Sequence, residues 1–286
     1  MKNKSFLLGI LSSLLFLLAC KSGPSGEAYV LKMRLNESDS FNHNMKVKMD
    51  TKVTGQDMKM DMDMDMGISF YVMENKNEEK KLRLTYTKMK MKMDMANMGV
   101  NTDSLMNKNQ NKIVGKSIQI SLSPSNEITD VSGFDSLMVK EMYEPETRQL
   151  MEKSFSKEQL NSMFGMMFSM YPSKAVRVGE TWKAKTKFNM ANIDMNITII
   201  FKLLSVKDGI AEINVDGKID GDGKMNQAGM DLSLAMKGTQ KGKLRIKLID
   251  GYLKTGFYDM DMTADMEVLG QKIPMSIKAN YEMSGE

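Results

Sequence analysis

The side chains of this chain best suited to unusual chemistry are thioethers, arranged in two alternating runs. Methionine occurs 33 times in 286 residues. The runs place it at every second position, as Met58, Met60, Met62, Met64 and Met66, and again as Met89, Met91, Met93 and Met95. Thioethers pack adaptably in cores, suit the walls of apolar ligand sites, and prefer Cu(I) as a metal. Core packing, an apolar ligand cavity, a copper site and sacrificial oxidation therefore all remain open.

The chain offers little for catalysis. His43 is its only histidine, and no Gly-x-Ser-x-Gly elbow accompanies it. Because His43 lies in a strand-like stretch between two asparagines, a solvated or hydrogen-bonded imidazole is the simpler interpretation. We therefore predict a protein that is not an enzyme, and an unrecognised hydrolase is only the third hypothesis.

Acidic residues could bind calcium at two places. Asp61-x-Asp63-x-Asp65 resembles the start of an EF-hand loop, but its glycine falls one place late and Val72 replaces the bidentate glutamate. Residues 216–223 hold three aspartates among three glycines, and we interpret them as a flexible polar turn. No metal site and no cofactor are predicted from these carboxylates.

Cys20 is the only cysteine, and it ends an apolar run near the N-terminus. Lys2 and Lys4 precede an apolar stretch over residues 6–18, which is short for a membrane-spanning helix, and Leu17-Leu18-Ala19-Cys20 closes the pattern. This pattern resembles the lipobox of bacterial lipoproteins. The resemblance implies that residues 1–19 are removed as a signal peptide and that Cys20 carries a covalent lipid anchor.

Charge and composition limit the partners. Removal of residues 1–19 deletes Lys2 and Lys4, so the formal charge falls from +4 to +2. So balanced a mixture of charges gives no concentrated basic patch, and nucleic acid is not an expected partner. With Cys20 lipidated no thiol remains for disulfides, so stability must come from a packed core. The expected partners are the membrane, through the lipid, and an apolar ligand.

Strict alternation predicts long β-strands. In residues 58–66 and 89–95 methionines point to one side and Lys or Asp to the other, because successive strand residues face opposite ways. If paired residues have numbers that sum to 153, as Met62 and Met91 do, every lysine of the two runs lies opposite an aspartate. Nearer the turn, the apolar residues lie opposite one another only if the numbers sum to 152. We predict a hairpin with a β-bulge at residue 87 or 88.

The second half of the chain resembles the first. Asp194-Met195-Asn196-Ile197-Thr198 resembles Asp65-Met66-Gly67-Ile68-Ser69, which predicts a duplicated β-unit. Between the copies, a capping signal at Ser156 and apolar residues at helical spacing predict a helical insertion at about 134–171. The predicted division is a signal peptide at 1–19, a lipidated tether at 20–27, β-units at 28–133 and 173–286, and a helical segment at 134–172.

These elements predict a mainly β fold, either a large curved antiparallel sheet or a flattened barrel with a helix over one opening. The layout resembles that of lipoprotein-carrier and mycobacterial lipid-binding envelope proteins, whose half-barrels hold acyl chains. Gly179-Glu180-Thr181-Trp182 also resembles the strand opening of uncharacterised β-rich envelope lipoprotein families. Those families bring no activity with them.

The sequence therefore predicts a non-enzymatic, membrane-anchored lipoprotein of the bacterial cell envelope. Its methionine-lined interior binds an apolar or amphipathic molecule, or the protein is a plain scaffold. The second hypothesis is a Cu(I)-binding or copper-handling lipoprotein. Lys21 follows the lipidated residue, in place of the aspartate that retains many lipoproteins at the inner membrane, so the resemblance favours the outer membrane.

Overall fold

The protein is built almost entirely of strands. The computed structural model describes residues 26–55, 58–96, 112–133, 165, 167–168, 170–190, 193–227, 230–268 and 270–286. The strands are β1 (Ala28–Tyr29), β2 (Ser40–Val53), β3 (Met58–Lys76), β4 (Glu79–Ala96), β5 (Ser117–Leu122), β6 (Ile128–Ser132), β7 (Val176–Arg177), β8 (Thr181–Met190), β9 (Ile193–Lys207), β10 (Ile210–Gln227), β11 (Met230–Lys247), β12 (Leu253–Val268) and β13 (Gln271–Gly285). The predicted mainly β fold is confirmed.

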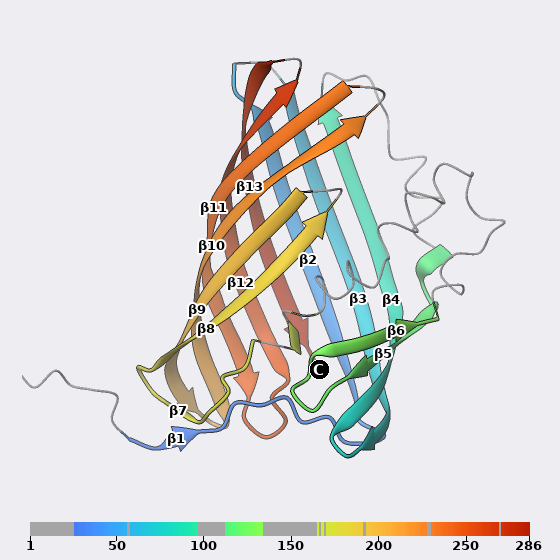
Figure 1. The fold of residues 1–286 in the computed structure, drawn as a ribbon. Helices are drawn as coiled ribbons and strands as arrows, with labels where there is room; N and C mark the ends of the chain where they lie inside the picture. The colour runs from blue at the N-terminus through green and yellow to red at the C-terminus, as the bar shows by residue number, and fades with distance from the viewer. Residues whose placement is uncertain are drawn as a thin grey trace, which may run out of the picture.

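One large antiparallel sheet dominates the fold. Its eleven described strands follow the order β6-β5-β4-β3-β2-β13-β12-β11-β10-β9-β8, and the sheet bends across its width (Figure 1). The edge strands β6 and β8 do not pair with each other, so the described sheet is open and the predicted flattened barrel is wrong. Closure would need a strand pair there, but β6 is only five residues long and β8 carries alternating lysines that disfavour edge pairing.

The sheet consists of two meanders that meet at its centre. The first runs from β2 to β6 and the second from β8 to β13, and β2 pairs with β13 so that Met49 lies opposite Ala279. Of the predicted helical insertion at 134–171, Gly165, Met167 and Phe168 have helical geometry, and most of the remainder lies outside the described residues. Within the described part of the chain, no helix has the length and apolar character needed to cross a membrane.

The β3–β4 hairpin confirms the predicted bulge but not the predicted register. Pairing shifts between Gly67 and Ile68, so Thr87 is the extra residue on β4. Met62, however, lies opposite Met93, two places beyond its predicted partner. Because the displacement is an even number of residues, every side chain keeps its predicted face.

The turn of this hairpin explains the displaced register. Asn77 (φ 53°) and Glu78 (φ 66°) both have left-handed backbone, as a two-residue type I′ turn requires, and Lys76 lies opposite Glu79. A second shift at Met73 adds one more unpaired residue to β3. Neither feature leaves a trace in the alternation of methionine and charge, so the pattern alone placed the partners two residues away.

Equivalent turns lead into β2 and β8, at the start of each meander. Ser38 (φ 72°) donates its N–H to the carbonyl of Val72 at 2.9 Å, and Gly179 (φ 91°) donates to that of Leu203 at 2.7 Å. In both turns the next residue accepts a hydrogen bond back from the same partner. The matching turns agree with the expected duplication, which stays a prediction.

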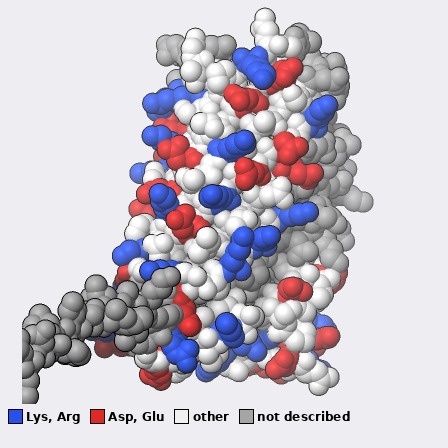
Figure 2. Space-filling view, turned by 60° about the vertical axis from the view of Figure 1, so that its left-hand side comes forward, with Lys and Arg blue, Asp and Glu red and all other residues white. Residues whose placement is uncertain are grey.

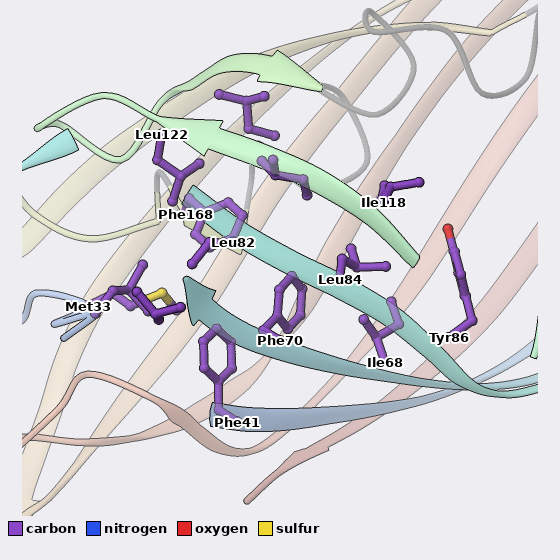
Figure 3. Close-up of a cluster of buried hydrophobic side chains, with 14 of the residues drawn as sticks. Met33, Phe41, Ile68, Phe70, Leu82, Leu84, Tyr86, Ile118, Leu122 and Phe168 are labelled. Carbon is purple, nitrogen blue, oxygen red and sulfur yellow. The ribbon is translucent and has the colours of Figure 1, made fainter. Parts of the chain in front are cut away.

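The largest described core cluster lies at one end of the sheet, the lower end in Figure 1, which we call the base. Side chains from β2, β3, β4 and β5 converge there with Met33 and Phe168 (Figure 3). Phe41 stacks on Phe70 with ring centroids 4.7 Å apart, and Leu82 is fully buried beside them. A second cluster, centred on Phe201 and other residues of β9 to β11, packs at the same end of the second meander.

Residues 31–35 tie the two clusters together. Leu31 is buried in the second cluster, whereas Met33 and Leu35 are buried in the first. The N–H of Arg34 donates to the carbonyl of Asp250 at 2.8 Å, in the turn between β11 and β12. This segment therefore closes the base across both meanders.

Replacing Gly251 by alanine should lower the free energy of unfolding by about 2 kcal/mol. Gly251 has φ +77°, and a Cβ there would lie 2.2 Å from the Lys32 carbonyl oxygen. Gly270→Ala is the matched control, because Gly270 has φ +78° and open space around it, so only the backbone cost of about 1 kcal/mol applies. Urea unfolding of both variants measures the difference, and equal losses would contradict the role given to residues 31–35.

The outer face of the sheet is a mosaic of opposite charges, as Figure 2 shows. Lys88 pairs with Asp65, Lys243 with Glu212 at 2.9 Å, and Lys59 with Asp50 at 3.2 Å. Such exposed pairs contribute about 0–1 kcal/mol each. They keep this face in water and leave the opposite face, which we call the inner face, to the apolar side chains.

Candidate ligand-binding face

The predicted methionines all lie on strands whose alternation directs them to the inner face. Met58, Met60, Met62 and Met64 of β3 are half-buried, and so are Met89, Met91 and Met93 of β4. Met66 is 7 % exposed and belongs to the base cluster, whereas the side chain of Met95 lies outside the described set. The structure therefore brings the eight methionines with described side chains together on one surface.

The observed register sets the thioethers in rows across the strands. Met64 lies opposite Met91, and Met66 lies opposite Met89 on β4 and Met45 on β2. Directly opposed side chains in a sheet have Cβ atoms about 4.5–5.5 Å apart. Each row therefore presents a continuous thioether surface.

Sequence reasoning missed the methionines that extend this surface. They are Met45 and Met49 on β2, Met195 on β9, Met236 on β11, Met260, Met262 and Met266 on β12, and Met275 and Met283 on β13. Their alternation with charges, as in Asp259-Met260-Asp261-Met262, was a usable signal. An isolated Met-x-Met pair is a weaker sequence signal than a run of four or five alternating methionines. The predicted ligand-lining residues therefore came only from the first meander.

Coverage of the inner face changes along the strands. Toward the base, Ile68, Phe70 and Leu244 are buried in the two clusters. Higher up, a third cluster around Ile219 and Met262 fills part of the second meander. Met58, Met60, Met62 and Met64 of β3 and Met91 and Met93 of β4 remain half-buried. The described inner face is thus filled at the base and only partly covered above it.

Glycines on β10 and β11 make room for larger inner-face neighbours. A Cβ on Gly217 would lie 2.4 Å from Cγ of Gln240, and one on Gly238 would lie 2.3 Å from Cγ of Met262. Distances under 3.0 Å are not tolerated, so Gln240 and Met262 lie flat against the backbone of the adjacent strand. The glycine-rich stretch 216–223 is therefore a strand, and its interpretation as a flexible turn is wrong.

A few inner-face side chains can form hydrogen bonds. Gln240 is 5 % exposed and Thr51 is 9 % exposed, while Tyr258 and Tyr281 stack with ring centroids 4.4 Å apart. No hydrogen bond joins any of these four side chains to another described residue. Burial raises the pKa of both tyrosines above the ordinary range, so their hydroxyls stay protonated.

His43 lies deeper on the same face, among aromatic rings. Its ring makes edge contacts with Phe41 at 5.8 Å and Phe70 at 6.0 Å, between centroids. Burial lowers its pKa to about 4, so the imidazole is neutral at physiological pH. The imidazole forms no hydrogen bond to another described residue, so the predicted solvated or hydrogen-bonded state is not what the structure shows.

The carboxylates do not form a metal centre among the described residues. No group of three or more His, Cys, Asp or Glu side chains there could hold an ion. Asp61, Asp63 and Asp65 alternate along β3 on its outer face, so they do not converge as an EF-hand loop requires. An outer-face hollow of about 550 Å³ is lined by both signs of charge, including Asp222, Asp265, Lys224 and Lys272.

The predicted strand opening at residues 179–182 has a structural role at the base. The Nε1–H of Trp182 donates to the carbonyl of Met170 at 2.8 Å, and its ring stacks on Phe201 at 5.5 Å. Arg177 bonds to Glu180, and its side chain donates to the carbonyl of Gly26 at 3.2 Å. The first described residue of the chain is therefore held at the base.

Comparison with known proteins gives one family match. A family model described as a family of unknown function (DUF6263) matches residues 77–253. Among the curated proteins, none matches the sequence.

Among solved structures, one described as "Lipid-protein interactions in lipovitellin" has a TM-score of 0.51 at 8% identity. The match covers 88% of this chain and 25% of that protein, so this chain spans a quarter of its length. OpdQ of Pseudomonas aeruginosa has a TM-score of 0.25 at 7% identity, and the match covers 88% of this chain and 99% of that protein. An outer-membrane channel of Pseudomonas putida F1 has a TM-score of 0.24 at 8% identity, and the match covers 89% of this chain and 97% of that protein. Of these three, the likeness to lipovitellin supports a statement, which concerns the fold alone.

Proposed function

We infer a function from geometry because the chain belongs to DUF6263, a family of unknown function that brings no activity with it. We propose that the protein is a non-enzymatic lipoprotein of the bacterial cell envelope. Its inner face binds an apolar or amphipathic molecule. Cys20 carries the lipid anchor, and the outer membrane is the proposed location.

The observation that carries this proposal is the half-buried thioether surface of β3 and β4. Met60, Met62, Met64, Met91 and Met93 lie side by side on a face where the described residues at this level carry no charge. A contiguous apolar surface that is only half-buried is typical of an interaction site. Methionine suits a variable apolar partner, because its unbranched side chain adapts to many shapes.

The filled base and the open upper part suit a molecule that enters along the strands. From Met58 to Met66, β3 covers nine residues, or about 26 Å at a rise of about 3.3 Å per residue. An extended long acyl chain fits within that span. The likeness to lipovitellin, a protein described for its lipid–protein interactions, supports the same class of ligand.

The proposed anchor would lie close to the filled end. Five residues lie between Cys20 and Gly26, whose carbonyl is bound by Arg177 at the base. Such a tether spans at most about 20 Å. A membrane-embedded lipid on Cys20 would hold the base near the bilayer and leave the upper end of the strands directed away from it.

Replacing Met62 by lysine should weaken binding of N-phenyl-1-naphthylamine, a neutral apolar fluorophore, at least about tenfold. The lysine would add a charge where the probe excludes water. Thr239→Lys is the control, because exposed Thr239 of β11 lies opposite Asp261 on the outer face and the same charge is tolerated there. Fluorescence titration of the full chain measures both. No saturable binding, or equal loss in both variants, would contradict the proposal.

One observation also supports Cu(I) as a second candidate. Met89, Met66, Met45 and Met283 form a single row across four strands, and His43 lies two residues from Met45. Thioether and neutral imidazole are ligands that Cu(I) accepts. Mass spectrometry after anaerobic Cu(I) loading would detect one tightly held ion per chain, and loss of that ion in Met45→Leu would support this candidate.

A further inference from the structure

The inner face separates apolar surface from charge completely over its upper part. From Met45, Met66 and Met89 upward, the described inner-face residues of β2 to β4 and β8 to β13 include no Asp, Glu, Lys or Arg. The described Asp, Glu, Lys and Arg residues of these strand segments occupy the alternate positions, whose side chains lie on the outer face. Among the described residues, a ligand on this surface therefore meets no ion that could pair with a charged group.

The same surface nevertheless holds hydrogen-bonding groups close together. Tyr258 lies opposite Tyr281 on β13 and opposite Gly242 on β11, and Gln240 follows two residues away on the same side of β11. Diagonal neighbours of this kind are about 7–8 Å apart, within reach of long side chains. Gln240, Tyr258 and Tyr281, which we call the polar patch, thus form one group immediately above the base cores.

The polar patch has hydrogen-bonding capacity that no described residue uses. The Gln240 amide has two donors and an acceptor, and it has no hydrogen bond to another described residue. The Gln240 side chain is 5 % exposed, so a ligand on the inner face would meet this amide largely away from bulk water. Gly217 provides the space in which this amide lies, since any larger residue would collide with Gln240 at 2.4 Å.

We propose that the ligand carries an uncharged hydrogen-bonding group, such as an ester or a hydroxyl, that binds to the polar patch while its hydrocarbon chain lies on the methionine surface. This inference rests on the proposed function and names its ligand class. The amide and the two hydroxyls both donate and accept hydrogen bonds, which matches a neutral glycerol ester. A carboxylate buried there would lack a cation and would be disfavoured.

Displacement of N-phenyl-1-naphthylamine from the full chain tests the proposal with three competitors. Monoolein is neutral and hydrogen-bonding, oleate at pH 9 is anionic, and 1-octadecene is purely apolar, with all three kept below their aggregation limits. We expect monoolein to displace the probe at concentrations at least about tenfold lower than the other two need.

Two variants locate the effect. Gln240→Leu and Tyr258→Phe should each reduce the preference for monoolein over 1-octadecene at least about threefold. The preference is the ratio of the two displacing concentrations within one variant, so a change in probe affinity cancels. Thr239→Val, on the outer face of the same strand as Gln240, should leave this ratio unchanged. Equal displacement by monoolein and oleate, or an unchanged preference in Gln240→Leu, would overturn the inference alone. Failure of the probe to bind would overturn the proposed function instead.

Discussion

Replacing Phe70 by alanine is expected to lower the free energy of unfolding by about 3–5 kcal/mol. Phe70 is fully buried at the centre of the base cluster. Its ring stacks on Phe41 and makes edge contacts with Phe168 at 6.1 Å and His43 at 6.0 Å. Truncation removes apolar burial and leaves a cavity among rings from β2, β3 and the helical turn at residues 167–168.

Phe257→Ala provides a matched control for this effect. Phe257 is 52 % exposed on the outer face of β12, so the same truncation there should change stability by no more than about 0.5 kcal/mol. Urea unfolding followed by circular dichroism measures both variants. A loss below about 1 kcal/mol for Phe70→Ala, or similar losses for both, would mean that the base cluster does not hold the sheet together.

Stability should fall as the pH is lowered from 6.5 to 4, because His43 is buried in its neutral form. Burial lowers its pKa from 6.5, the ordinary value for an exposed histidine, to about 4 in the folded protein, so the unfolded chain binds a proton first over this range. The contribution of neutral His43 is complete above pH 6.5 and is lost toward pH 4. The difference of about 2.5 pKa units corresponds to about 3 kcal/mol.

His43→Leu separates this effect from the titration of carboxylates. The chain has a single histidine, so the variant removes the only imidazole while keeping an apolar side chain among Phe41 and Phe70. The free energy of unfolding at pH 7.5, 6, 5 and 4.5 should fall less steeply in the variant than in the parent. Parallel curves for the two proteins would show that His43 is not buried as a neutral group.

The alternation of side chains allowed the faces of the sheet to be predicted from sequence. Met62 and Asp63 lie on opposite faces as expected, because strand geometry repeats every two residues wherever the strand pairs. The bulge at Thr87 was also predictable, since the apolar parity changes there. The face of each side chain and the position of the bulge depend only on residue types at neighbouring positions, which can be read from the sequence.

Long-range features were less accessible. The pairing of Met62 with Met93 depends on the turn at Asn77 and on the bulge at Met73, and two charge registers two residues apart look alike in sequence. The pairing of β2 with β13 joins residues more than two hundred positions apart, so no local pattern indicates it. Gln240 gave no signal either, because its significance comes from burial against Gly217 and from apolar neighbours on other strands.

The central claim is that an apolar or amphipathic molecule lies on the inner methionine surface, and photo-crosslinking tests it most directly. A neutral glycerol ester with a diazirine in its acyl chain is irradiated with the full chain, and the adducts are located by peptide mass spectrometry. We predict adducts within residues 58–66, 89–95 and 260–266 that disappear when excess monoolein competes. Adducts confined to outer-face residues, or labelling that monoolein does not reduce, would contradict the account.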